Sequence, residues 1–161
     1  MKVFYNSKIA KLVTFLADFA TIMLFGAVFT EHDSLSERCK HHEAVHVTQY
    51  QTMFMLGLSI AFGVFFACLG FDVYGWWMLS LLLIPLSLYY VWYLVEYVVR
   101  LIMYRDSGKA YRMIAFEREA YDLEYEYMKP CPERRSAYSF RFFKYYETTP
   151  PPNFAAGRRI P

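Results

Sequence analysis

The run His42-Glu43-Ala44-Val45-His46 has the residue types and the spacing of a hydrolytic zinc site. On a helix, positions i and i+4 lie about 40° apart around the axis and about 6 Å apart along it. His42 and His46 would therefore share one face and could hold one tetrahedral zinc ion. Glu43 is rotated by about 100° from His42, where its carboxylate can take a proton from a water at the metal. The run predicts zinc as cofactor, two histidine ligands and Glu43 as general base.

Other polar residues near this run admit two interpretations each. His41 and His32 leave open a histidine-rich patch that is merely solvated on a helix surface. Gln49 shares the face of the two predicted ligands, so it could orient a ligand, bind a substrate amide or simply satisfy a buried contact. Cys39, three residues before His42, could be a ligand or a small half-buried side chain.

A second motif lies far downstream, in the run Phe116-Glu117-Arg118-Glu119-Ala120-Tyr121. With Gln49 one turn after His46, the two motifs read H-E-x-x-H-x-x-Q and E-x-E-A. Together they resemble the minimal gluzincins, especially a group of small bacterial membrane proteins with a hydrophobic hairpin between the motifs. The layout is more distantly similar to the membrane zinc proteases that process prenylated proteins. The resemblance covers residues around 21–51 and 89–128.

The resemblance implies a zinc metallopeptidase with Glu117 as third ligand, and an edge strand within Thr21–Thr30 that can hold a peptide by strand addition. Many gluzincins carry an Asp four residues after the ligand glutamate, but Tyr121 occupies that position here, with Asp122 as the nearest carboxylate. Tyr121 and Asp122 are thus candidates for the shell around the ligands. Glu119 and Glu96 are alternatives to Glu117, although Glu96 also suits an ion pair with Arg100.

The elements that must position these residues are predicted from hydrophobicity. The composition is 57% hydrophobic and 20% aromatic, well above an ordinary soluble domain. Met53–Phe71 and Trp76–Val95 carry no charge, and each is long enough to cross a hydrocarbon core of about 30 Å as a helix. The link 72–75 is turn-forming, so the two segments predict a transmembrane hairpin in contact with lipid. A buried helical pair of a soluble protein is the alternative, and Pro85 could kink the second span.

Charge placement predicts the topology. All 17 Lys and Arg residues lie before Met53 or after Val99, which puts both termini and the zinc site on the cytoplasmic side. The resemblance implies a bacterial inner membrane. A net charge of +2 gives no reason to expect nucleic acid as partner. The three cysteines lack C-x-x-C spacing, which favours reduced thiols.

The remaining elements complete a single, mainly α-helical, membrane-embedded domain over residues 1–161. Its parts are an N-terminal region with the zinc helix (1–52), the hairpin (53–104), the third-ligand helix (105–130) and a tail (131–161). Ser34-Leu35-Ser36-Glu37 fits a capping box that opens the zinc helix, which can run on into the first span. A third cytoplasmic helix is expected over Lys109–Met128. The tail is expected to wrap a surface or to stay partly mobile.

The segment Leu12–Thr30 is open to three interpretations. It follows three lysines as a signal peptide would, and its length also suits a third span, but Asp18 opposes both. We expect a short helix around residues 7–18 and an extended piece, Thr21–Thr30, broken by Gly26. The predicted function is hydrolysis of a membrane-associated polypeptide near the bilayer surface. The alternatives are an idle zinc-binding subunit that docks partner membrane subunits, and a hydrolase acting on a lipid or another amide.

Overall fold

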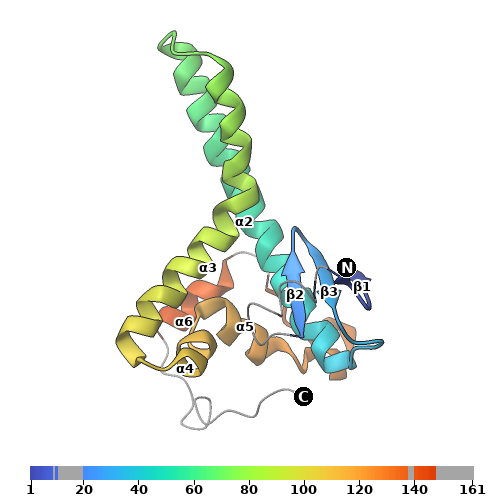
Figure 1. Ribbon diagram of the computed structural model, residues 1–161. Coiled ribbons are helices and arrows are strands. Elements are labelled where there is room, and N and C mark those ends of the chain that lie inside the picture. Colours follow the sequence, from blue (N-terminus) through green and yellow to red (C-terminus); the bar gives the residue numbers. More distant parts are fainter. Residues whose placement is uncertain (9, 11–19, 138–139, 148–161) are drawn as a thin grey trace.

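The computed structural model describes residues 1–8, 10, 20–137 and 140–147. Figure 1 shows a tower of two long helices, α2 (Glu37–Gly70) and α3 (Leu83–Tyr104), above a base that holds a small sheet and the shorter helices. Helix α2 and the helical stretch Trp76–Tyr104, which contains α3, are each long and apolar enough to cross a membrane. The mainly helical fold class and the apolar helical hairpin are confirmed. The helix expected around residues 7–18 falls largely outside the described residues.

Helix α2 carries the predicted zinc run at its base and the first apolar segment in the tower, without a break. Its 34 residues extend about 51 Å at the usual rise per residue. The capping residue is Ser36, whose hydroxyl accepts the backbone N–H of Cys39 at 3.2 Å. The predicted box from Ser34 is therefore wrong, because the helix begins two residues later. The continuity of the zinc helix with the first apolar segment is confirmed.

The second tower segment begins as the 3₁₀ helix η1 (Trp76–Leu82) and becomes α-helical at Leu83. Pro85 is the third residue of α3, in its first turn just after the change from 3₁₀ to α-helix, where a proline is tolerated. Gly57 of α2 packs directly against it: a Cβ at Gly57 would lie 2.6 Å from Pro85 Cα. A glycine is needed here because the two backbones touch.

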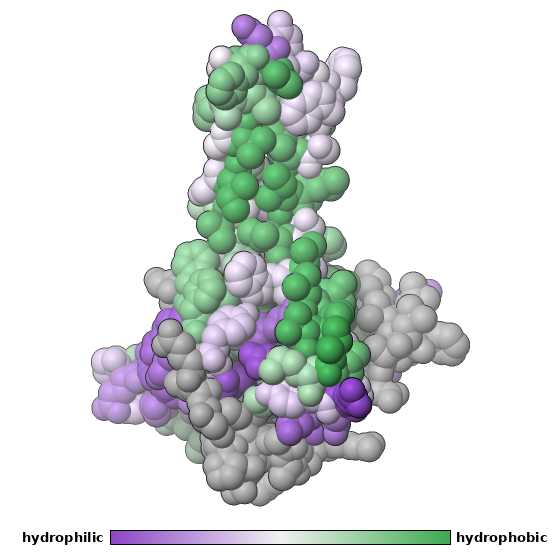
Figure 2. All heavy atoms as spheres, turned by 90° about the vertical axis from the view of Figure 1, so that its left-hand side faces the viewer, coloured by the Kyte–Doolittle hydropathy of each residue, from purple (hydrophilic) through white to green (hydrophobic). Residues whose placement is uncertain are grey.

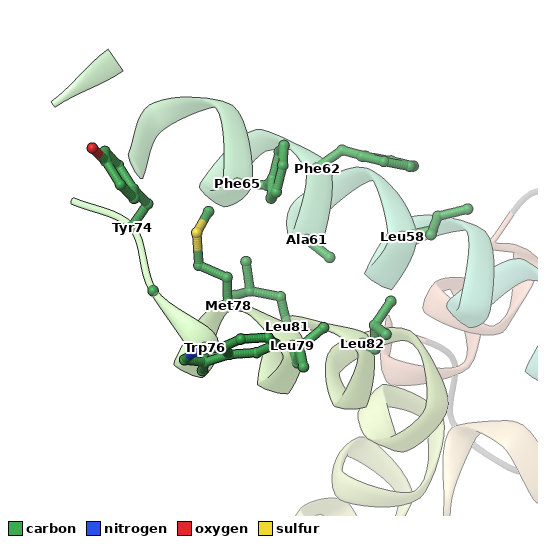
Figure 3. A pocket seen from close by; sticks show the side chains of 11 residues that line it. Leu58, Ala61, Phe62, Phe65, Tyr74, Trp76, Met78, Leu79, Leu81 and Leu82 are labelled. Atoms are coloured by element: carbon green, nitrogen blue, oxygen red, sulfur yellow. The ribbon is translucent and has the colours of Figure 1, made fainter. Parts of the chain in front are cut away.

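Near the tip of the tower, α2 and η1 enclose an apolar cavity of about 540 Å³ (Figure 3). Phenylalanine and leucine side chains line most of it, with Tyr74 and Trp76 at the turn. No charged residue lines this cavity, and none of the predicted site residues does. It belongs to the apolar surface of the tower.

The sheet contains β1 (Lys2–Phe4), β2 (Thr21–Leu24) and β3 (Ala27–Thr30) in the order β1-β3-β2. The extended piece predicted over Thr21–Thr30 is therefore two antiparallel strands, and of these only β2 is at an edge. They reverse at Phe25 and Gly26, both with positive φ. Phe25 N–H donates to the Tyr90 hydroxyl at 2.6 Å, which fixes the hairpin tip to the tower.

The third helix predicted over Lys109–Met128 is wrong as a single element. The chain forms α4 (Ser107–Arg112), α5 (Ala115–Leu123) and the short 3₁₀ helix η2 (Glu126–Met128). No side chain at Ile114 caps α5; instead the Glu96 carboxylate of α3 accepts the N–H of Ala115 at 2.9 Å. This contact stabilises a helix start at Ala115 and ties α5 to the tower.

The segment after Pro130 wraps the base with η3 (Cys131–Glu133), η4 (Arg141–Phe143) and α6 (Lys144–Glu147). Phe142 is buried against Phe116 of α5, with 4.4 Å between ring centroids. Phe116 also packs on Tyr89 of α3, so one aromatic core joins the tower to α5 and to this segment.

Candidate metal centre

The two histidines of the predicted run and the glutamate of the second motif meet in the interior. His42 and His46 come from α2 and Glu117 from the first turn of α5; all three are buried. The Nε2 atoms of His42 and His46 are 3.2 Å apart. The Glu117 carboxylate spans both rings, with Oε1 3.2 Å from His46 Nε2 and Oε2 3.5 Å from His42 Nε2. Among the described residues, this is a group of three that could bind a metal ion.

The spacing suits a small four-coordinate cation. In a tetrahedral zinc site with bonds of about 2.0–2.1 Å, neighbouring ligand atoms lie about 3.3–3.4 Å apart. The separations here are 3.2 to 3.5 Å. Glu117 Oε2 is buried without a hydrogen-bond partner, although it faces His42. Lone pairs that converge in this way without enough donors need a cation, so the donor set fits a metal.

Gln49 determines which ring nitrogen of His46 carries the proton. Its Nε2 donates to the Phe116 carbonyl at 3.1 Å and to Glu119 Oε2 at 2.9 Å, which uses both amide hydrogens. Its Oε1 must then accept from His46 Nδ1, 2.9 Å away. That bond fixes the proton of His46 on Nδ1 and leaves Nε2 to face the centre.

His42 is held from the other side by Glu124, which follows α5. Its Oε2 lies 3.6 Å from His42 Nδ1, within ion-pair range but longer than a hydrogen bond. The other oxygen accepts from Arg38 at 2.6 Å, so the carboxylate is oriented by an ion pair. The Tyr121 ring packs edge-on against His42, with centroids 4.8 Å apart. The carboxylate partner of His42 thus comes from Glu124, while Tyr121 contributes a ring contact.

Helix α3 contributes two tyrosines to the centre. The Tyr93 hydroxyl donates to Glu117 Oε1 at 2.8 Å, and the Tyr89 hydroxyl lies 3.3 Å from His46 Nδ1. Both residues belong to the uncharged second segment of the tower. The centre therefore lies beside the last turns of that segment.

The electrostatics of the centre favour positive charge between the carboxylates. Burial opposes charge on His42, but its contacts with Glu117 and Glu124 outweigh this and raise its pKa to about 10. Burial would likewise raise the pKa of Glu117, yet the two histidines hold it well below its usual range. A proton or a metal ion can meet this demand, and the two compete for the same nitrogens. Burial also raises the pKa of Glu43, which lies beside the two histidines.

The structure separates the remaining candidates. Glu119 faces Gln49, and burial raises the pKa of its carboxyl to about 7. Asp122 faces away from the centre and pairs with Arg135 at 2.8 Å. Glu96 binds Ala115 N–H and Arg100. Cys39 is outside the group that could bind a metal.

Three residues around the centre, Glu124, Tyr89 and Tyr93, were not predicted from the sequence. Glu124 lies two helical turns after Glu117, which is the one signal that could have indicated it. For the tyrosines the only signal was polar tips at helical spacing within an apolar segment. Comparison with family models, curated proteins and solved structures finds no match for this chain.

Proposed function

We propose that this protein is a membrane-bound zinc metallopeptidase of the gluzincin type, which cleaves membrane-associated polypeptides near the bilayer surface. The observation that carries the proposal is the buried convergence of His42, His46 and Glu117, with Glu43 next to the first ligand on the same helix. Two histidines and one glutamate are a ligand set used by catalytic zinc, which keeps a fourth position open.

The roles follow from the placement of each side chain. Bound here, zinc would polarise the scissile carbonyl and acidify water. Glu43 would accept a proton from the water molecule as the water oxygen bonds to the carbonyl carbon. It would then pass that proton to the leaving amine as the C–N bond breaks. Gln49 and Tyr93 would hold His46 and Glu117 in place. Strand β2, at the sheet edge and in contact with α2, would pair with an extended substrate.

Burial of the centre favours a second candidate. Glu43 is 9% exposed, and the three proposed ligands are less exposed still. A site so enclosed also suits a catalytically idle subunit that binds metal for stability and docks partner helices. The two candidates differ in what they require of Glu43: a peptidase needs its carboxylate, whereas an idle subunit needs only its shape.

The deciding experiment compares cells that carry wild type with cells that carry Glu43→Gln. We expect an uncleaved membrane protein to accumulate in the variant, while the purified variant keeps its zinc and its fold. If the membrane proteomes match and the variant complements a deletion, the protein is an idle subunit and the peptidase proposal fails.

The one-sided placement of Lys and Arg supports cytoplasmic termini, so Cys131 should label from the cytoplasmic side.

A further inference from the structure

The lower half of α3 carries an exposed apolar face on the side opposite the metal centre. We name it the α3 stripe; it consists of Val91, Leu94, Val95, Val98, Val99, Ile102 and Met103, all exposed. Figure 2, which views the α3 side of the molecule, shows the hydrophobic surface of the tower continuing down onto the base. The charged residues of this stretch, Glu96 and Arg100, pair with each other on the inward side.

The width of the stripe indicates what covers it. At about 100° per residue, its seven positions extend over about half of the helix circumference. A partner helix buries a narrower seam of two positions per heptad, whereas lipid chains cover every outward position. The stripe is also continuous with the apolar surface of the tower, which is long enough to cross a membrane.

The chemistry at the lower end of the stripe agrees with lipid. Tyr104 ends α3, Arg105 follows, and Lys109 lies over the Tyr104 ring at 4.7 Å. The nearby acidic residue, Asp106, caps α4 through the Lys109 N–H. An aromatic ring with basic groups at the edge of an apolar surface matches the phosphate-bearing headgroup layer. We propose that the α3 stripe lies in the bilayer, and that Arg105 and Lys109 meet the headgroups.

Immersion of this face changes where the metal centre lies. The stripe extends about 18 Å from Val91 to Met103 along the helix axis. Tyr89 and Tyr93, which contact His46 and Glu117, project from the other side of the same helix. The centre is then separated from lipid by about the width of one helix, about 10 Å. Tyr89 and Tyr93 lie 15 and 11 residues before Tyr104, so the centre is about 17–22 Å along the helix axis from the proposed headgroup level. If the proposed function holds, the substrate class is a membrane-spanning polypeptide cut within the bilayer.

Depth measurement in lipid tests this inference. Full-length protein with Cys39, Cys68 and Cys131 replaced by Ala is reconstituted into phosphatidylcholine–phosphatidylglycerol vesicles, after a check that its circular dichroism matches wild type. A nitroxide is attached at Val98→Cys or Ile102→Cys. The control is Met128→Cys on η2, because Met128 is 71% exposed and Ile102 is 72% exposed. Collisions with oxygen and with a water-soluble nickel chelate are then compared.

We expect the labels at 98 and 102 to favour oxygen and the label at 128 to favour nickel. Nickel access at 102 equal to that at 128 would overturn the inference. Dipolar broadening between labels at 102 would also overturn it, since a second copy would then cover the stripe. The measurement needs neither metal nor turnover, so its failure is distinguishable from failure of the peptidase proposal.

Discussion

Glu124 stands beside His42 in the interior, with its Oε2 3.6 Å from the ring Nδ1 and its other oxygen 2.6 Å from Arg38. Glu124 lies seven residues after Glu117 in the sequence. The ion pair with Arg38 fixes the carboxylate. Glu124 can therefore orient His42 in the way that carboxylate partners orient metal-binding imidazoles.

Glu124→Gln should weaken zinc binding by about 10–100-fold, because His42 loses the negative charge that lies 3.6 Å from its Nδ1 and favours a proton there. The matched control is Glu126→Gln: Glu126 is also buried but pairs with Lys129 and Arg135, away from the centre. Affinity is measured by competition with a chelator in detergent. Equal affinities for the two variants would show that Glu124 has no part in holding the metal.

Glu117→Gln should lower zinc affinity far more than Glu119→Gln or Glu96→Gln. Only Glu117 faces both imidazoles, whereas Glu119 accepts from Gln49 and Glu96 accepts from Ala115 N–H. The same chelator competition ranks the three. A larger loss in the Glu96 or Glu119 variant than in the Glu117 variant would mean that the third ligand is misassigned.

Gly57→Ala should destabilise the tower by about 1–3 kcal/mol, because the new methyl group would overlap Pro85 backbone. Gly63→Ala on the same helix is the control. A Cβ there meets nothing within 4 Å, so the change should be neutral or stabilise by up to about 1 kcal/mol. Unfolding of both in detergent is followed by circular dichroism. Equal stabilities of the two variants would contradict a direct backbone contact between α2 and α3 at Gly57.

Acid should loosen the segment that wraps the base. Hydrogen bonds from Lys129 and Arg135 lower the pKa of Glu126 to about 2, from an ordinary 4.5. Because the folded pKa is depressed, its contribution to stability is complete above pH 4.5 and is lost as pH falls toward 2. Glu126→Gln should flatten the stability profile over that window. Stability profiles of wild type and variant that remain parallel below pH 4.5 would refute this role.

The features that the sequence could predict are those that depend on local periodicity. The i, i+4 spacing of His42 and His46 and the uncharged length of the tower helices are properties of a single helix. Glu117 was found through a motif rather than through geometry. The break before Ala115 could not be foreseen, since it depends on the Glu96 carboxylate 19 residues earlier.

The residues that surround the proposed ligands could not be predicted from local sequence patterns either. Glu124 reaches His42 only because α5 packs against α2, and Tyr93 reaches Glu117 only because α3 packs against α2 as well. Likewise, Asp122 was the nearest carboxylate in sequence but binds Arg135 of the wrapping segment. Each of these depends on how separate elements pack, which one helix period does not encode.

Elemental analysis of zinc in purified wild type, His46→Ala and Glu43→Gln tests the proposed metal centre most directly. We expect about one zinc per chain in wild type and in Glu43→Gln, since Glu43 is not among the proposed ligands. We expect loss of zinc in His46→Ala. In wild type, His46 Nε2 lies 3.2 Å from His42 Nε2 and 3.2 Å from Glu117 Oε1, and the variant lacks this atom. Full zinc in His46→Ala would contradict the assignment of the metal centre.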